Sequence, residues 1–501
     1  MTAPPAAQKT VPGHVLTRWV FLRLLGVVYL CAFASLWPQV RGLIGSHGIL
    51  PAGEYLAAVR AQAGTAGYSL APTLAWLDAS DLGLELLCGA GTLLSLLLIA
   101  GVLPLPTLAL LWGLYLSLVN IGQDFLSFQW DALLLEAGFL AILFAPGGVL
   151  PRPVTEAPPS RAALWLLRWL LLRLMFQSGV VKLASGDTAW RSLTALAYHY
   201  ETQPLPTPLA WLMFQLPLWF QKLSTGAVLA VELIAPWLIL GPRRLRLIAA
   251  GLLAALQLLI LLTGNYAFFN LLTLALCVLL LDDDALRRLL PPRLRPRWAE
   301  PERRPDPPRW RRWVIGPAAA LLLGMSLLRL SADLGVPNPW PQALGWQEPL
   351  HLVNGYGLFA VMTTSRPEVF VEGSDDGRTW RAYGLHFQPQ ALGRAPRWVA
   401  PYQPRLDWQL WFAALGSPDE TPWFRAFLVR LLQGSPAVLG LLGTNPFPAH
   451  PPHYVRAVLY DYRFTDGATF RSTHAWWRRR PLGLYFPPAS LAGSPHAPPG
   501  E

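Results

Sequence analysis

The stretch "RRLLPPRLRPRWAEPERRPDPPRWRR" (Arg287–Arg312) lies between two apolar segments and contains much of the positive charge of the chain. Cytoplasmic loops of membrane proteins are rich in Lys and Arg. We therefore expect residues 282–312 to form a basic cytoplasmic loop. A nucleic-acid-binding surface would instead interleave such charge with aromatic residues on a folded face. The net charge of +11 thus does not indicate a nucleic-acid partner.

The composition around this loop is typical of an integral membrane protein. Of 501 residues, 53% are hydrophobic and only 14% are charged, whereas soluble proteins carry about 25% charged residues. The lysines are Lys9, Lys182 and Lys222, and every other residue of the Lys and Arg total is Arg. This bias is typical of a GC-rich genome and predicts a bacterial source, with the chain in the cytoplasmic membrane.

Apolar stretches of about 20 residues predict the membrane spans. We expect about nine, at 17–37, 83–103, 105–119, 125–145, 162–184, 225–241, 245–263, 266–281 and 313–330. The stretch Leu209–Leu223 is interrupted by Pro217 and rich in Trp and Phe, so we expect it at the membrane interface.

Alternation of these spans is consistent with the distribution of charge. If the arginine-rich loop is cytoplasmic, "GPRRLR" (Gly241–Arg246) is cytoplasmic too. The connections at 38–82, 120–124 and 264–265 fall on the other side and are poor in Lys and Arg. The N-terminus is then cytoplasmic, and everything after Leu330 is extracytoplasmic.

After Leu330 the hydrophobic pattern changes. "PEVFVEGSDDGRTWRAYGLHF" (367–387) alternates apolar and polar residues around Asp376-Gly377, which predicts a hairpin, and "YVRAVLYDYRF" (454–464) predicts another strand. "DWQLWFAAL" (407–415) and "PWFRAFLVRLLQG" (422–434) have helical spacing. We expect a multi-pass α-helical bundle (17–330), then a strand-rich, β-sandwich-like extracytoplasmic domain with inserted helices (331–488), with tails at 1–16 and 489–501.

Ionisable and polar residues at membrane depth are candidates for function. The expected spans contain Asp131, Glu136, Arg173, Gln177, Lys182 and Glu232. We expect Glu136 and Arg173 to pair and hold helices together, since polar bonds between helices stabilise membrane bundles. The other four lie nearer the extracytoplasmic end, where they would line a pocket beneath His199 and Glu201. Lys182 is the candidate catalytic base there, because a desolvated lysine can accept a proton, and His199 and Glu201 are candidate catalytic residues beside it.

Motifs of common enzyme classes are absent from the sequence. There is no G-x-S-x-G elbow, H-E-x-x-H, Walker A or G-x-G-x-x-G segment. Asp282-Asp283-Asp284 resembles a metal cluster, but consecutive carboxylates at a helix end more often form a solvated cap. The sequence therefore gives no support to a hydrolase, and we expect no metal.

Long segments of the chain resemble the lipase maturation factor family. The matching motifs follow one another along nearly the whole chain: "FLSFQWDALLLEAGFL" (Phe125–Leu140), "MFQSGVVKLASGDTAWRSLTALAYHYETQPLPTPLAW" (Met175–Trp211), "GNYAFFNLLTL" (Gly264–Leu274), "LVNGYGLFAVMTTSRPEVFVEGSDDG" (Leu352–Gly377), "PYQPRLDWQLWFAAL" (Pro401–Leu415), "LLGTNPFP" (Leu441–Pro448) and "WWRRRPLGLYFPP" (Trp476–Pro488). The most recognisable part of this signature contains Tyr198, His199, Tyr200, Glu201, Gln203, Pro204 and Pro206.

The resemblance implies a multi-pass membrane protein, located in the endoplasmic reticulum in animals, whose C-terminal domain assists the folding and assembly of secreted lipases. It implies a folding factor and not an enzyme, with no cofactor and no catalytic residues to assign. The expected partners are the lipid bilayer and a secreted lipase or another exported client. A bacterial source departs from this pattern, so the family resemblance does not by itself fix the client.

A shorter segment is similar to vitamin-K-dependent gamma-glutamyl carboxylase. In "GVVKLASGDTAW" (Gly179–Trp190) the residues that match are Gly179, Lys182, Leu183, Asp187 and Trp190. This resemblance implies an alternative in which Lys182 is the base of a membrane enzyme that acts on a lipid-soluble, quinone-type cofactor. A transporter is a weaker alternative, because the sequence shows no inverted repeat.

The segment Tyr198–Trp211 joins the two regions in this interpretation. Pro204, Pro206 and Pro208 favour an extended, stiff conformation. We expect the segment to lie on the extracytoplasmic side, between the bundle and the C-terminal domain. There it would cover a polar pocket formed by Asp131, Gln177, Lys182 and Glu232.

Overall fold

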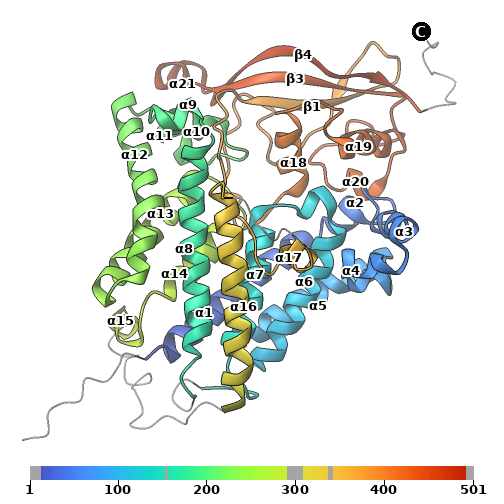
Figure 1. Cartoon of the computed structure of the whole chain (residues 1–501). Helices are drawn as coiled ribbons and strands as arrows, with labels where there is room; N and C mark the ends of the chain where they lie inside the picture. Colours follow the sequence, from blue (N-terminus) through green and yellow to red (C-terminus); the bar gives the residue numbers. More distant parts are fainter. Residues whose placement is uncertain (1–12, 153–155, 290, 292–308, 337–341, 492–501) are drawn as a thin grey trace, which may run out of the picture.

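The computed structural model describes residues 13–152, 156–289, 291, 309–336 and 342–491. Long helices lie side by side, and a β-sheet formed by the C-terminal part of the chain crosses one end of them (Figure 1). We call this end of the bundle the sheet end and the opposite one the far end. The residues from 342 onward are called the C-terminal part.

Seven helices of the described chain are long and apolar enough to cross a membrane. They are α1 (Val15–Leu36), α5 (Asp81–Ala100), α6 (Pro104–Ile121), α8 (Arg161–Ala184), α12 (Leu218–Ile234) with its extension η4 (Ala235–Leu240), α13 (Arg243–Thr263) and α16 (Arg309–Asp333). The chain therefore has an integral membrane domain.

The expected number of about nine spans is not confirmed. The expected spans at 125–145 and 266–281 correspond to α7 (Gln129–Phe144) and α14 (Phe269–Val278), of 16 and 10 residues. Both are shorter than the roughly 20 residues that cross a bilayer. Most of Arg287–Arg312 lies outside the described residues.

Local signals in the sequence explain where the long helices begin and end. The hydroxyls of Ser80 and Ser160 accept hydrogen bonds from the first turns of α5 and α8. Pro217 immediately precedes α12, so the apolar stretch Leu209–Leu223 divides into α11 (Pro208–Phe214) and the start of α12. Leu218–Leu223 belong to a helix long enough to cross a membrane, whereas the interfacial position of the segment stays a prediction.

Short helices connect the long ones. Those that precede the C-terminal part are α2 (Val40–Ile44), α3 (Ala52–Ala63), η1 (Gly64–Ala66), α4 (Gly67–Leu70), η2 (Leu74–Trp76), η3 (Gln123–Leu126), α9 (Thr188–Arg191), α10 (Ala195–Thr202) and α15 (Asp283–Leu289). At the far end, the buried Asp283 carboxylate accepts hydrogen bonds from the backbone N–H groups of Val15 and Thr17 and so holds α1 against α15.

The C-terminal part contains one antiparallel sheet. Its strands are β1 (Pro367–Ser374), β2 (Arg381–Ala382), β3 (Tyr454–Phe464) and β4 (Trp477–Ala489), in the order β2-β1-β3-β4. The hairpin predicted around Asp376-Gly377 joins β1 to β2, with Gly377 at a positive φ of 70°. The strand predicted at 454–464 is β3.

The β-sandwich-like arrangement is not confirmed, because the described strands form this four-stranded sheet, with helices beside it. Both predicted helices are present, as α18 (Arg405–Ala413) and α19 (Pro422–Leu432). The remaining helices are α17 (Gln342–Gly345), η6 (Glu348–Leu350), α20 (Pro436–Leu439) and α21 (Gly467–Thr473). Buried apolar side chains of the bundle and of the C-terminal part form one continuous core.

Candidate functional site

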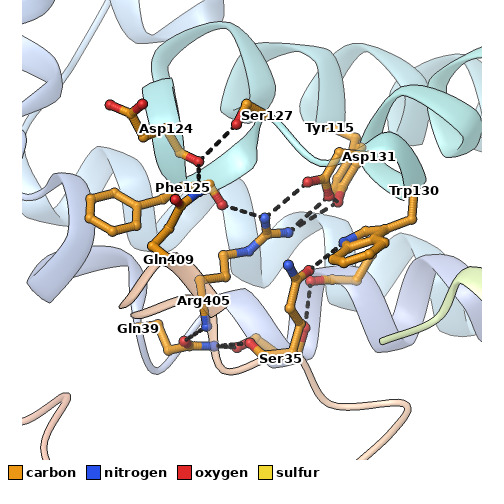
Figure 2. Close-up of polar contacts among 12 residues, drawn as sticks. Ser35, Gln39, Tyr115, Asp124, Phe125, Ser127, Trp130, Asp131, Arg405 and Gln409 are labelled. Atoms are coloured by element: carbon orange, nitrogen blue, oxygen red, sulfur yellow. Dashed lines mark hydrogen bonds and ion pairs between the residues drawn. The ribbon is translucent and has the colours of Figure 1, made fainter. Parts of the chain in front are cut away.

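A buried ion pair joins the C-terminal part to the membrane helices. Arg405, the first residue of α18, has both terminal nitrogens on Asp131 in α7, at 3.0 and 2.9 Å. Neither side chain is exposed (0% each). The same guanidinium donates to the carbonyl of Phe125 at 2.6 Å, and the Tyr115 hydroxyl donates to Asp131 (Figure 2). Asp131 is therefore neutralised by Arg405 and does not line the expected pocket.

Amide side chains surround this pair. The Gln39 side chain accepts from the Arg405 backbone N–H at 2.9 Å and donates to the Gln403 carbonyl at 2.8 Å. The Trp130 indole N–H donates to the Gln403 side chain at 2.7 Å (Figure 2). Groups from the start of α2, from α7 and from the C-terminal part thus bond one another, and the two regions meet in a buried polar contact.

The expected pair of Glu136 and Arg173 is present, with both side chains buried. The Glu136 carboxylate also accepts from the Asn354 backbone N–H at 2.9 Å and from the Tyr356 hydroxyl at 2.7 Å. Arg173 donates to the Asn354 carbonyl at 3.0 Å. This second contact also joins membrane helices to the C-terminal part, which supports a structural role for the pair.

Gln177 does not reach the expected pocket. Its side-chain N–H donates to the Asp333 carboxylate in α16 at 2.5 Å.

The solvated cap expected at Asp282-Asp283-Asp284 is only partly solvated. Asp282 and Asp283 are buried, and Asp282 pairs with Arg243. The bundle uses these carboxylates to connect helices.

Lys182 and Glu232 form the remaining part of the expected pocket. The Lys182 ammonium lies 2.8 Å from each oxygen of Glu232, and both residues are 5% exposed. It also donates to the Ser178 carbonyl at 3.1 Å and lies 5.3 Å from the centre of the Trp190 ring. The pair therefore joins α8 to α12 with its charges compensated.

A mainly apolar cavity of about 390 Å³ adjoins this pair. We call it the membrane cavity. Its walls come from α8, α12 and α13. Its lining includes Lys182, His199, Tyr200, Glu232, Tyr266 and Phe359. A cavity of this size and lining suits a lipid-soluble molecule.

His199 lies on the wall of the membrane cavity. One ring nitrogen, Nε2, is 3.1 Å from the Tyr266 hydroxyl, and the ring contacts Phe359 edge-on with centroids 4.8 Å apart. Burial, and then the nearby charge of Lys182, lower the pKa of His199 to about 4. The imidazole is therefore neutral at physiological pH.

Glu201, the other expected partner of Lys182, points to a different place. Its carboxylate pairs with Arg463 at 2.9 Å and accepts from the Phe464 backbone N–H at 3.1 Å. Beside it the buried Arg366 donates to the carbonyls of Glu201, Gln203 and Pro204. Glu201 therefore binds the sheet, and a catalytic role together with Lys182 has no geometric support.

The segment Tyr198–Trp211 lies between the bundle and the C-terminal part, as expected. Arg366 holds it from the sheet, and the Trp411 indole N–H donates to the Thr202 carbonyl at 3.0 Å. It covers Lys182 and Glu232 but not Asp131 or Gln177. The expected extended conformation is present only between the short helices α10 and α11, where Thr207 has extended backbone angles and Pro206 forms an isolated bridge with Gly264, and Pro208 is already the first residue of α11.

A second cavity, of about 500 Å³, lies where α7, α18 and residues 357–363 meet. We call it the junction cleft. Its lining is aromatic and amide-rich and includes Phe128, Gln129, Trp130, Trp408, Trp411 and Phe412. Tyr266, Leu358 and Phe359 line both this cleft and the membrane cavity, so these residues lie between the two spaces. Phe359 has a positive φ of 55°, a strained backbone for a residue with a side chain.

Both halves of the chain match models of known families. Residues 16–288 match the lipase maturation factor transmembrane domain, and residues 352–487 match the lipase maturation factor C-terminal domain. The chain belongs to the lipase maturation factor family. The resemblance found in the sequence motifs is thereby confirmed.

Several relatives in this family are similar over most of their length. Human lipase maturation factor 2 is 38% identical, with 96% of this chain and 83% of the relative aligned. Lipase maturation factor 1 of Mus musculus is 35% identical, covering 95% of this chain and 87% of the relative. That of Bos taurus is 36% identical, over 97% and 93%. No solved structure matches.

Sequence reasoning missed the cations and amides with which the C-terminal part of this family member binds the buried carboxylates of the bundle. Arg405 lies in "PYQPRLDWQLWFAAL" and Asn354 in "LVNGYG", both quoted above as family motifs. A carboxylate at membrane depth such as Asp131 needs a partner, and that requirement is the signal that could have directed attention to Arg405. Asp187 and Trp190, which match the carboxylase, bind the Met362 N–H and the Phe359 carbonyl.

Proposed function

We propose that this member of the lipase maturation factor family assists the folding or assembly of a secreted lipase, or of another exported protein, at the sheet end of its membrane domain. Family membership and the names of the relatives support the client class. The single observation that carries the proposal is the rigid connection of the C-terminal part to the bundle through Asp131–Arg405 and Glu136–Arg173–Asn354. It presents the junction cleft as an ordered surface.

We propose that the C-terminal part is extracytoplasmic and the N-terminus cytoplasmic. The arginines of "GPRRLR" (Gly241–Arg246) follow η4 at the far end, where Arg243 pairs with Asp282. Basic residues favour the cytoplasmic side. A secreted client would then meet the sheet end during export, before or while it folds.

The test is co-expression with a secreted lipase in cells that lack an endogenous maturation factor. The expected result is a several-fold rise in lipase activity per amount of secreted lipase protein, since the factor changes the folded fraction and not synthesis. An unchanged ratio, with the chain present in the membrane at normal levels, would contradict the proposal. A variant lacking residues 342–501 but retaining the bundle is not a suitable control, because it leaves Asp131 unpaired.

A second candidate function is favoured by the membrane cavity beside Lys182. Under this proposal the chain is a membrane enzyme, and Lys182 is a base acting on a quinone-type lipid that occupies the cavity. The apolar walls fit such a molecule, and the cofactor would supply the redox chemistry. For Lys182 to accept a proton it must first give one up, and Glu232 at 2.8 Å is the nearby acceptor.

Substitution of Lys182 separates the two candidates. Lys182→Met and Lys182→Arg are compared in the lipase co-expression assay, with Glu232→Gln added to Lys182→Met so that no charge is left unpaired. Full recovery of active lipase with both single variants would exclude a catalytic role of Lys182. Loss with both, at normal protein levels and with no rescue by the paired variant, would contradict a purely passive folding factor.

A further inference from the structure

We propose that the membrane cavity binds the hydrocarbon chain of an uncharged membrane lipid, which enters sideways from the bilayer between α12 and α13. The site requires neither the folding role nor catalysis by Lys182, so it goes beyond both proposed functions. It is supported by the shape of the cavity, by its opening on the outer faces of two membrane helices, and by the compensated charge on its inner wall.

The cavity follows the length of two neighbouring helices. Its lining on α12 extends from Phe220 to Val231 and Glu232, and its lining on α13 from Leu252 to Thr263, in each case at helical spacing. Eleven residues correspond to about 16 Å of helix axis. The space of about 390 Å³ is therefore elongated, as an extended hydrocarbon chain requires.

The outer side of the cavity opens onto the lipid-facing surface of the bundle. Among its lining residues, Leu252 and Leu259 are 42% and 60% exposed, and the small residues Ala227 and Ala255 are exposed as well. Both helices are apolar and long enough to cross a membrane, so exposed side chains on their outer faces meet acyl chains. A lipid can thus reach the cavity without leaving the bilayer.

The inner wall is polar but offers no free charge. The charged side chains among the described lining residues are Lys182 and Glu232. The Lys182 ammonium bonds both Glu232 oxygens and the Ser178 carbonyl, which uses its three N–H donors. A phosphate, sulfate or carboxylate head would lose its water without gaining a counter-ion. An anionic lipid is therefore disfavoured.

Two hydroxyl groups suit an uncharged head group. Tyr200, which is 5% exposed, and Ser224 line the cavity, and neither hydroxyl has a hydrogen-bond partner within the described part of the chain. Each can donate to a carbonyl, ester or hydroxyl oxygen. Acylglycerols and quinones both combine such oxygens with a long chain, and this shared chemistry defines the ligand.

Photolabelling of the full-length protein in phosphatidylcholine nanodiscs tests the site. The probe is a monoacylglycerol with a diazirine in its chain, and peptide mass spectrometry locates the labelled residues. We expect saturable labelling of Leu174 and Met175 in α8, which line the cavity but are 1% and 3% exposed. Lipid that only coats the outer surface cannot reach these residues.

Competitors distinguish the head groups. Excess monoolein should lower the α8 labelling at least fivefold, whereas oleyl sulfate, with a similar chain and a permanent charge, should lower it less than about twofold. Decylubiquinone represents the second source of the same chemistry. Competition by it alone would support the site and assign the head group to a quinone.

Three alanine substitutions test the path of entry. Ala227→Trp and Ala255→Trp place a large ring at the opening and should each lower the α8 labelling at least fivefold. Ala230→Trp is the matched control, because Ala230 is exposed on α12 three residues from Ala227 but does not line the cavity. Its labelling should stay within about twofold of the wild type.

Removal of both hydroxyls tests the head-group contact without closing the opening. Tyr200→Phe combined with Ser224→Ala keeps the apolar walls and should weaken binding of the monoacylglycerol roughly tenfold. The melting temperature of the empty protein should change little, because neither hydroxyl is bonded to the described chain.

Three results would overturn the inference: equal α8 labelling in the three tryptophan variants, labelling confined to exposed residues, or competition by oleyl sulfate as strong as that by monoolein. None of these measurements uses a lipase. If α8 is labelled as predicted but lipase recovery never rises, the lipid site stands without the folding role. If lipase recovery rises and α8 is never labelled, the folding role stands and the lipid site is wrong.

Discussion

Arg405 and Asp131 show at the scale of single residues why charges are retained inside this protein. Each is fully buried, and each is the other's counter-ion. Removing one member of a buried pair leaves an uncompensated charge, which is far more costly than removing both. The two charges therefore compensate each other only when the C-terminal part is correctly docked on the bundle.

Arg405→Gln should destabilise the protein by about 3–5 kcal/mol, because Asp131 is left as an unpaired buried carboxylate. Adding Asp131→Asn should recover a substantial part of this loss. Thermal unfolding of the detergent-solubilised protein, followed by intrinsic fluorescence, measures both effects. Arg425→Gln is the control, since its ion pair with Asp419 is 58% and 79% exposed and is worth about 1 kcal/mol or less. Equal effects of the two single variants would contradict the prediction.

Asp407 predicts a pH dependence in the C-terminal part. Burial raises the pKa of its carboxyl from 3.8 to about 7, against the opposing effect of hydrogen bonds from the Phe387 and Gln388 backbone N–H groups. Because the folded pKa lies above the unfolded one, the folded state binds the proton more tightly. This contribution to stability is complete below about pH 4 and is lost as the pH rises toward 7.

Asp407→Asn should remove this contribution, because the amide does not titrate and its carbonyl can still accept from Phe387. The measurement is the difference in melting temperature between pH 5 and pH 8. We expect the wild type to lose more stability than Asp407→Asn over that range. A variant with the same or a larger loss would show that other groups control the pH response.

At the scale of elements, much of the arrangement was predictable. Apolar length located the long helices, and the hairpin and β3 followed from alternation and from Asp376-Gly377. The alternation of apolar and polar residues does not show whether the strands form one sheet or two. The sequence therefore could not distinguish a single sheet from a sandwich. Helical spacing found α18 but not the role of Arg405, since the pairing depends on two segments 274 residues apart.

The strap formed by α10, the proline-rich turn and α11 is held to the C-terminal part by several side chains, among them Arg366, the residue before β1. Arg366 reaches the carbonyl groups of Glu201, Gln203 and Pro204 with a fork of donors. Arg366→Lys should loosen the strap, because a lysine ammonium cannot reproduce this planar geometry. Limited proteolysis should then cut within 195–214 several times faster than in the wild type. Arg381→Lys, which changes a half-exposed ion pair with Asp375, should leave the cleavage rate unchanged.

At the scale of the whole molecule, the bundle and the C-terminal part share one core, the buried Asp131–Arg405 ion pair, and the hydrogen bonds of Asn354 and Tyr356 to Glu136. The site was only partly predictable for this reason. Lys182 and Glu232 lie together as expected, because α8 and α12 run side by side. Asp131 and Gln177 instead bind Arg405 and Asp333, which come from later parts of the chain. Depth along a helix does not specify which face a residue occupies.

The two regions should therefore unfold as one cooperative unit. A chain that ends at residue 336 lacks Asn354, Tyr356 and Arg405 and leaves Asp131 unpaired in α7, so we expect it to aggregate or to be degraded. A chain that ends at residue 491 keeps every contact described above and serves as the control. Steady-state level in the membrane and elution from a sizing column in mild detergent report the outcome. A stable, monodisperse product ending at residue 336 would contradict cooperative unfolding.

The Asp131–Arg405 contact also has a consequence for biosynthesis. Asp131 is synthesised early in translation, and its counter-ion is made 274 residues later. Arg405 can reach it only if the C-terminal part has been delivered to the side of the bilayer on which α7 begins. A chain with an inverted or missing span would deliver Arg405 to the opposite side and keep a bare carboxylate in its helices. We expect the last region to be synthesised to dock only on a correctly inserted bundle, so that a topological error leaves an unpaired carboxylate and lowers the amount of stable protein.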